Sequence, residues 1–411
     1  MSLLVIKFGG TSVGDVERIK NAAGKVAAEV RLGHKVVVVV SAMAGVTDQL
    51  IQCCRSITPR PDAREQDAIV ASGEQVSAGL MALALEQRGF NARSWQGWQL
   101  PLNTDSTHSK ARITSVNTET LRRRLDEGEI AVITGFQGIA SDGSITTLGR
   151  GGSDTSAVAI AAALKADRCD IYTDVEGVYT SDPRIVPKAQ KLSRVSYEEM
   201  LELSSLGAKV LQVRSVEMAL RFHVPVQVLS TFGNAIGSEL PGTLVTDEDE
   251  TMERKVVTGV AMSPNQAKVT LSKVLDRPGV AATIFGALGR AGVNVDMIVQ
   301  TSSDDEQTTD VTFTVNRSDL ERARQVIEAE REKIGYASVL TDSNVVKISL
   351  VGAGMRSHSG VAALMFETLA DKKINIQTIE TSEISISVLI AEEYAELALR
   401  SLHTTFGLDA V

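Results

Sequence analysis

The chain has 411 residues, more than one hydrophobic core usually organises, so two or three domains are expected. Hydrophobic residues make up 43% of it and charged residues 23%, which is typical of a globular protein. The formal net charge of -9 disfavours a nucleic-acid-binding surface, because such a surface needs clustered lysine and arginine. It does not exclude phosphate ligands, which a few basic residues can hold.

The cysteines and the N-terminus indicate the compartment. Cys53, Cys54 and Cys169 show neither a disulfide framework nor the spacing of a metal site, and are interpreted as reduced thiols. The apolar run Leu3–Phe8 is too short for a signal peptide, and no run reaches membrane-spanning length. We therefore predict a cytoplasmic protein with no membrane partner.

The first two thirds of the chain alternate between strand and helix patterns. After a first short strand, a helix is predicted over Val16–Arg31, and Lys35–Val40 (KVVVVV) is a β-branched run typical of a strand buried on both faces. Further along the chain, helices are predicted over 75–88 and 154–164, and strands over Ile130–Thr134 and 169–173. The alternation predicts an α/β fold: a mainly parallel sheet sandwiched by helices, with ligands beyond the carboxyl ends of the strands.

The last third repeats itself after a charged stretch over 247–254. Residues 276–281 (DRPGVA) precede a helix and the turn VNVD, and residues 357–362 (SHSGVA) precede a helix and the turn INIQ. Each copy continues with a strand, at 311–315 and 386–390, and an amphipathic helix. The repeat predicts two ferredoxin-like α+β modules.

The second copy lacks a closing strand, because few residues follow its last helix at 394–406. The apolar run over 256–262 precedes the first copy without an obvious partner there, so we expect it to cross over and complete the second module. The predicted domains are a catalytic domain over 1–246, a first module over 264–343, and a second module over 256–262 plus 344–411.

Two glycine clusters point to phosphate chemistry. In Lys7-Phe8-Gly9-Gly10-Thr11-Ser12 the glycines allow backbone N–H groups to approach phosphate oxygens, while the lysine adds charge and the serine a donor. In Gly149-Arg150-Gly151-Gly152-Ser153-Asp154-Thr155 a helix start offers free N–H groups, and the arginine suits a carboxylate. The plainer alternatives are a strand-turn-helix with glycines for geometry and an aspartate that caps its helix.

Three further polar features each allow a functional and a structural interpretation. The segment 172–184 (YTDVEGVYTSDPR) suits an adenine and ribose pocket, or is an ordinary polar loop. Glu74 could hold a substrate ammonium, or stabilise its helix start. Lys209 is a second phosphate contact or a surface lysine. The five histidines do not group into a metal site, so any metal is expected to be Mg²⁺ brought with ATP.

These motifs together resemble those of the aspartokinase family. The resemblance rests on VIKFGGTSV at the start, SAM at Ser41, SGE at Glu74, LGRGGSDTSA around Arg150, and YTDVEGVYTSDPRIVP from Tyr172. The two C-terminal modules resemble ACT domains, which bind small regulatory amino acids. The resemblance covers essentially the whole chain, and it implies phosphorylation of the side-chain carboxylate of L-aspartate by ATP, which opens the pathway to lysine, threonine and methionine.

The resemblance also implies roles for single residues. Those implied for ATP are Lys7, Phe8, Gly9, Gly10, Ser12, Ser41, Thr173, Asp174, Tyr179, Asp182, Arg184 and Lys209. Those implied for L-aspartate are Thr47, Glu74, Arg150, Gly151, Gly152 and Ser153. Lys7, Asp154 and Lys209 would be catalytic. Asp154 would hold the lysines and not act as a base, because the attacking carboxylate is already ionised at neutral pH.

For regulation, the resemblance implies lysine and threonine as effectors. One effector site would comprise Asp276, Gly279, Ala281, Gln300, Asn375 and Ile376. The other would comprise Asn294, Asp296, Ser357, His358, Val361, Thr381 and Glu383. Relatives commonly have a basic residue where this chain has Ser385, and some start a separate regulatory subunit near the position of Met252. The modules are expected to pair between chains as a homo-oligomer, a dimer or higher.

Two other functions compete with this one. A kinase of the same fold could act on another carboxylate such as acetylglutamate, but an acetylated substrate would leave Glu74 without its ammonium. A catalytically silent amino-acid sensor would use only the two modules. The presence of Lys7, Arg150, Asp154 and Lys209 argues against a silent protein.

Overall fold

The computed structural model describes residues 2–100, 102–208, 210–248, 256–302, 307–353, 355, 358 and 360–409. The chain divides into two compact units: residues 1–179 with 191–254, and residues 180–190 with 255–411. The segment 180–190 therefore belongs to the second unit, although the residues on both sides of it in the sequence belong to the first.

The first unit contains an eight-stranded sheet with the order β10-β12-β11-β9-β1-β2-β6-β3. Its strands are β1 (Leu3–Phe8), β2 (Lys35–Val40), β3 (Ala92–Trp95), β6 (Ile130–Thr134), β9 (Arg168–Thr173), β10 (Arg194–Ser196), β11 (Val226–Ser230) and β12 (Thr243–Thr246). Neighbouring strands pair in parallel except β11 and β12. The mainly parallel α/β fold is confirmed, and β2 and β6 have the predicted bounds.

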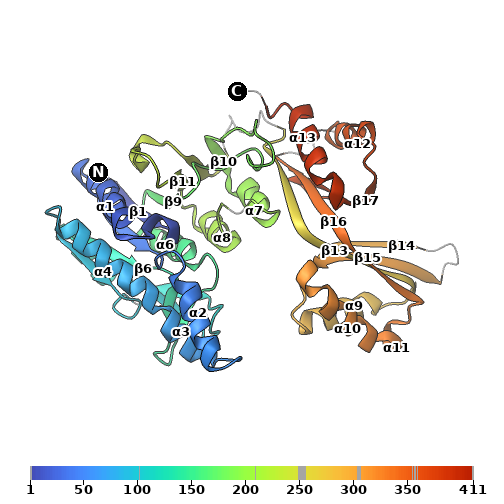
Figure 1. Ribbon diagram of the computed structural model, residues 1–411, viewed down its shortest axis with the longest axis horizontal. Coiled ribbons are helices and arrows are strands. Elements are labelled where there is room, and N and C mark those ends of the chain that lie inside the picture. The colour runs from blue at the N-terminus through green and yellow to red at the C-terminus, as the bar shows by residue number, and fades with distance from the viewer. Residues whose placement is uncertain are drawn as a thin grey trace. The chain divides into compact units, whose positions relative to one another are not determined.

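Helices cover both faces of this sheet (Figure 1). The helices of the first unit are α1 (Val16–Arg31), α2 (Val46–Ile57), α3 (Ala63–Val70), α4 (Ser72–Glu86), α5 (Glu119–Asp126), α6 (Gly152–Leu164), α7 (Tyr197–Ser205) and α8 (Val213–Phe222), of which α2 and α3 do not pack on this sheet. A second sheet, which the sequence did not predict, has the order β5-β4-β7-β8. Its strands are β4 (Leu102–Thr104), β5 (Ile113–Val116), β7 (Gln137–Ile139) and β8 (Ile145–Thr147).

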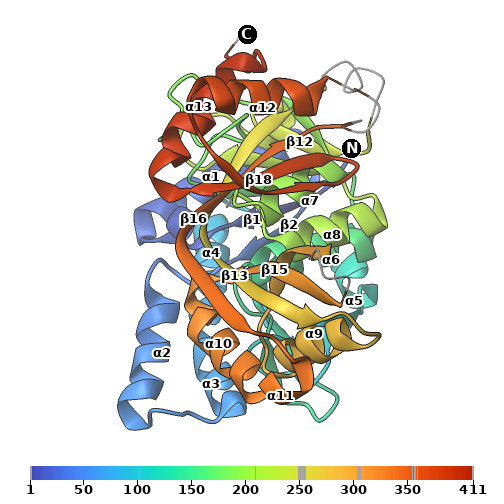
Figure 2. The same cartoon turned by 90° about the vertical axis from the view of Figure 1, so that its right-hand side faces the viewer.

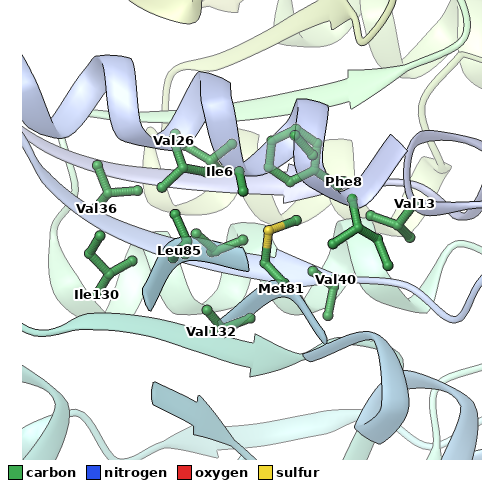
Figure 3. Packing of buried hydrophobic residues seen from close by; sticks show 14 of the residues in the cluster. Ile6, Phe8, Val13, Val26, Val36, Val40, Met81, Leu85, Ile130 and Val132 are labelled. Atoms are coloured by element: carbon green, nitrogen blue, oxygen red, sulfur yellow. The ribbon is translucent and has the colours of Figure 1, made fainter. Parts of the chain in front are cut away.

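The alternation of side chains along β1 and β2 decides what each face of the sheet buries. Ile6, Phe8 and Val38 pack with α1 and α4 in one core cluster, and Figure 3 shows part of this cluster, with Ile6 and Phe8 of β1 facing Met81 and Leu85 of α4. Lys7 lies between Ile6 and Phe8 in the strand and therefore points to the opposite face, on which α6 packs. The register of β1 thus places a lysine against α6.

The second unit is built on one six-stranded sheet with the order β14-β15-β13-β16-β18-β17. Its elements are β13 (Gly259–Leu275), α9 (Val280–Arg290), β14 (Val295–Ser302), β15 (Thr308–Asn316), α10 (Leu320–Ala329), α11 (Arg331–Ile334), β16 (Ser338–Val351), α12 (Val361–Asp371), β17 (Ile376–Thr381), β18 (Ser385–Ala391) and α13 (Ala395–Thr405). Figure 2 shows the long strands β13 and β16 running from α12 and α13 to α9, α10 and α11.

Both halves of β13 pair with β16. Residues 259–262 pair with Ile348–Val351, which in turn pair with β18 of the second repeat. Residues 266 and 268–271 pair both with β16 and with β15 of the first repeat. The run 256–262 that had no partner within its own repeat therefore continues directly into the first repeat's strand, and the two modules share a sheet.

One stretch, Ala63–Glu86, is long and apolar enough to cross a membrane by length and composition alone, but half of its most apolar window is buried within the protein. The core helix of a globular domain meets the same criterion. This stretch comprises α3 and α4, which pack in the first unit.

Two leucines of helix α4 form a matched pair that tests the packing of the core. The Leu85 side chain is fully buried in the core, whereas that of Leu83 is 62% exposed. Leu85→Ala should lower the free energy of unfolding of the first unit by about 2–5 kcal/mol, and Leu83→Ala by less than about 0.5 kcal/mol. Thermal and urea unfolding of both variants measures the difference. Equal losses would contradict the assigned packing of α4.

Candidate active site

The predicted nucleotide motifs meet at the carboxyl edge of the main sheet. Phe8 lies opposite Val40 on one side and Tyr172 on the other. The loops that follow β1, β2 and β9 therefore leave the sheet at the same edge. Backbone hydrogen bonds hold them there: Gly9 N donates to Tyr172 O (3.2 Å), and Ser41 N donates to Phe8 O (3.1 Å).

A buried ion pair connects this edge to α6. Lys7 Nζ lies 2.6 Å from Asp154 Oδ1, and both side chains are about nine-tenths buried. Asp154 is in the first turn of α6, where the helix dipole also favours a negative charge. The two residues come from motifs 147 positions apart, and they place an oriented ammonium group directly below the glycine loop.

The glycines of the first loop are needed for close approach. A Cβ at Gly10 would lie 3.0 Å from Ala42 O, and one at Gly9 would lie 3.3 Å from Lys7 Nζ. Ser12 was predicted to donate to a phosphate, but its buried hydroxyl contacts Tyr172 O and Thr231 Oγ1. In this structure Ser12 therefore joins the first loop to the loop that follows β11.

Glu74 is a buried carboxylate with unused capacity. Its Oε1 accepts a hydrogen bond from Ala42 N (2.9 Å), whereas its Oε2 is buried and has no hydrogen-bond partner among the described residues. Burial raises the pKa of Glu74 to about 7. The neighbouring Gly73 allows this approach, because a Cβ there would lie 2.8 Å from the Ala42 side chain. A cationic ligand group would satisfy the free oxygen.

The Arg150 loop is a tight turn between two glycines with positive φ, Gly149 (79°) and Gly151 (69°). At Gly151 a Cβ would overlap the side chain of Gln212, so only glycine fits. Arg150 itself is exposed at this turn, and Gly152 N closes the turn by donating to Gly149 O (3.0 Å). The guanidinium is therefore available to a ligand carboxylate.

Two residues that the sequence analysis missed hold the strand before this loop. Asp67 is buried and accepts hydrogen bonds from the backbone and hydroxyl of both Ser109 and Thr147. Arg214 donates to Leu148 O (2.7 Å). Each bond joins segments more than 40 residues apart, and no local pattern in the sequence marks either residue.

The other predicted substrate residues have mixed placements. Thr173 Oγ1 donates to Asp174 Oδ1 (3.2 Å), and Tyr179 donates to Glu176. Partial burial, and to a lesser extent the negative charge of Glu176, raises the pKa of Tyr179. Thr47 is partly buried in the first turn of α2. Lys209 lies outside the described residues.

Asp182 and Arg184 belong to the second unit, where they form a two-pronged ion pair with each other (2.7 and 3.0 Å). No group of three or more His, Cys, Asp or Glu side chains that could hold a metal occurs in the described part of the chain.

Most of the predicted effector residues that the structure describes are exposed. Asp276, Gly279 and Ala281 flank the start of α9, and Gln300 is on β14. Ile376 lines a hollow of about 390 Å³ in the sheet, together with Lys268 and Gln377, which are hydrogen bonded to each other. None of the other predicted effector residues lines this hollow.

Asp296 is held by a buried lysine that the sequence analysis did not single out. Lys347 Nζ lies 2.9 Å from Asp296 Oδ2 on β14 and 3.2 Å from Glu380 Oε2 on β17. It therefore joins the two modules by charge. Among the remaining predicted residues, Val361 is buried at the start of α12, His358 and Thr381 are exposed, and Ser357 lies outside the described residues. Ser385 is buried and contacts Ser382 (2.9 Å).

The fold and the site define a carboxylate or amino acid kinase followed by two regulatory modules. Residues 2–230 match the model of the amino acid kinase family, and residues 272–330 and 348–406 each match that of the ACT domain. The chain is 52% identical over 411 residues to an aspartate kinase of Pseudomonas putida, covering 100% of this chain and 98% of that one. It is 48% identical over 410 residues to an aspartokinase of Corynebacterium glutamicum, covering 99% and 97%.

Among solved structures, E. coli aspartokinase III in complex with aspartate and ADP superposes with a TM-score of 0.80 at 26% identity, covering 98% of this chain and 99% of that one. The same enzyme with lysine and aspartate gives a TM-score of 0.75. The chain belongs to the aspartokinase family and is an aspartate kinase with ACT regulatory domains.

The raised pKa of Glu74 predicts a pH-dependent stability. The unfolded chain loses the Glu74 proton near pH 4.5 and the folded chain only near pH 7, so this group's contribution to stability falls as pH rises between these values. Glu74→Gln keeps the acceptor for Ala42 N and removes the ionisation. As pH rises from 5 to 8, the free energy of unfolding of the variant should therefore increase by about 1–3 kcal/mol relative to that of the parent. Parallel stability curves in denaturant titrations would contradict the assignment.

Proposed function

We propose that the enzyme transfers the γ-phosphoryl group of ATP to the side-chain carboxylate of L-aspartate, giving 4-phospho-L-aspartate and ADP. The observation that carries the substrate assignment is Glu74: a buried carboxylate with one unpartnered oxygen, beside the loop that follows β2. An α-ammonium group is the ligand group that this oxygen suits. Binding it would favour the ionised form of Glu74 and lower its raised pKa.

The α-carboxylate of aspartate would be bound by Arg150, with Thr47 and residues 151–153 around it. An arginine and a carboxylate at separate points of one site distinguish a free amino acid from an acetylated one, since acetylation removes the ammonium. Acetylglutamate would leave Glu74 buried without a partner, which is unfavourable. The crystal structure of E. coli aspartokinase III in complex with aspartate and ADP supports the proposal of the same substrates here.

The chemical step would be direct. One oxygen of the aspartate side chain, already ionised at neutral pH, attacks the γ-phosphorus in line as the bond to the ADP oxygen breaks. Lys7, held by Asp154, would neutralise charge on the phosphoryl group, and the backbone N–H group of Gly10 would orient it, with Gly9 allowing its close approach. Lys209 would assist, while Ser41, Thr173, Asp174 and Tyr179 would line the nucleotide site. Mg²⁺ would enter bound to ATP, where its charge helps to neutralise the phosphates.

The ACT domains would make the enzyme sensitive to its pathway's products. We assign lysine, threonine or both as feedback inhibitors, supported by the named lysine complex of E. coli aspartokinase III. The inhibition would be a coupling between two states of a homo-oligomer in the cytoplasm, acting on the first step towards lysine, threonine and methionine. The catalytic domain would span 1–246, the first ACT domain 264–343, and the second 256–262 plus 344–411.

The test is ADP release by the purified protein with MgATP, with L-aspartate or N-acetyl-L-glutamate as acceptor. Turnover should depend on L-aspartate only and fall on addition of lysine or threonine. A second test is Glu74→Gln. The KM for aspartate should rise by about 10-fold or more, because the substrate ammonium loses its ionic partner, while the KM for ATP should stay unchanged. Equal use of N-acetyl-L-glutamate, or no effect of Glu74→Gln on the KM for aspartate, would contradict the proposal.

A further inference from the structure

The segment 180–190 continues the nucleotide loop but is built into the second unit. Three apolar side chains, Ile185, Val186 and Ala189, pack in the same hydrophobic cluster as α12 and α13 of the second ACT domain. In the sequence it follows directly after residues 173–179, the proposed nucleotide loop. The chain itself therefore connects the nucleotide loop to the second ACT domain.

The two ends of the segment form a narrow ribbon. Thr180 N donates to Gln190 O (2.9 Å), and one step earlier Leu192 N donates to Val178 O (2.8 Å). Tyr179 and Lys191 pair as an antiparallel bridge between these two bonds. Since hydrogen bonds join both sides of the ribbon, its residues should move together, and Tyr179 of the nucleotide loop is one of them.

Thr180 is the contact between this ribbon and α13. Its Oγ1 accepts a hydrogen bond from Gln190 N (2.9 Å), and Nε2 of His403, a fully buried residue of α13, lies 2.8 Å away. The hydroxyl proton of Thr180 is therefore free to be donated to Nε2. His403 then carries its own proton on Nδ1, which donates to Asp409 Oδ1 (2.6 Å).

Further hydrogen bonds hold Asp409 at one end of this series and the segment 180–190 at the other. The other carboxylate oxygen of Asp409 accepts from Thr404 Oγ1 (2.9 Å), so α13 holds Asp409 in place. Thr180 O accepts from Val260 N (2.8 Å), and Arg400 of α13 donates to Ile185 O (2.8 Å). The Thr180 hydroxyl and the Ile185 carbonyl group are thus bound by α13, and the Thr180 carbonyl group is bound by Val260 of β13.

We propose that Thr180 and His403 are positioning residues for the nucleotide loop, and that they pass a displacement of α13 in the second ACT domain to the ATP site through the ribbon. Neither residue touches a substrate in this account. The proposal rests on the proposed role of residues 173–179 in binding ATP. It predicts that breaking the Thr180–His403 bond weakens ATP binding and effector inhibition, and leaves aspartate binding unchanged.

Thr180→Val removes the hydroxyl at nearly constant shape, and Thr180→Ser restores it. The KM for ATP should rise about five-fold in Thr180→Val, the effect of one lost hydrogen bond, while the KM for aspartate stays within two-fold. Inhibition by whichever of lysine and threonine inhibits the parent should weaken. Thr180→Ser should return all values to those of the parent. The matched control is Thr405→Val, an exposed threonine of α13, which should change nothing.

A purely structural role would lower kcat through loss of folded enzyme and leave both KM values unchanged, and that result would overturn the proposal. If Thr180→Val fails to fold, His403→Gln is measured in its place. Hydrogen exchange of the amides of 173–179 in the full-length variant provides a second measurement, and unchanged protection there would also overturn it.

Asp174→Asn, within the nucleotide loop, separates the two claims. It should raise the KM for ATP whether or not the ribbon transmits anything. If Asp174→Asn raises this KM and Thr180→Val does not, only the present inference fails. If neither variant changes it, the nucleotide role of the loop is wrong and the inference falls with it.

Discussion

The arrangement of the catalytic domain depends on the ion pair between Lys7 and Asp154. Burying either charge alone would be strongly unfavourable, so each requires the other. The pair forms only if β1 presents Lys7 to the face covered by α6 and if α6 begins close to the end of β1. It therefore fixes the first glycine loop and the Arg150 loop relative to each other, and with them the two loops to which we assign the phosphoryl group and aspartate.

A buried lysine has a similar role in the regulatory unit. Lys347, on the strand shared by both modules, pairs with Asp296 of the first repeat and Glu380 of the second. Because β13 and β16 each run through both repeats, continuous strands connect the two ACT modules.

The sequence predicted those parts of the fold that have strong local patterns. Lys35–Val40 and Val16–Arg31 were found with the observed bounds, because a β-branched run and a 3.6-residue apolar period are visible within one element. The strands of the small sheet were missed, since strands such as Leu102–Thr104 are only three or four residues long and mixed in composition. The run 256–262 was predicted to complete the second module, and its residues 259–262 pair with Ile348–Val351; what no local pattern showed is that they begin a 17-residue strand shared by both modules.

The candidate site divides in the same way. Its motif residues, such as Lys7, Glu74 and Arg150, were found from glycine and charge patterns that neighbouring residues share. Asp67, Arg214 and Thr231 were not, because their partners lie 42 to 219 residues away and only the folded chain brings them together. The engagement of Ser12 by Thr231 was invisible for the same reason.

A double-mutant cycle on the catalytic ion pair tests the account most directly. The kcat of Lys7→Met, Asp154→Asn and the double variant would be measured with MgATP and L-aspartate. If Asp154 acts through Lys7, each single variant should lower kcat by about 10²–10³-fold, and Asp154→Asn should have little further effect once Lys7 is gone. If Asp154→Asn lowers kcat by the same factor in the presence and absence of Lys7, the two residues act independently and the central claim is wrong.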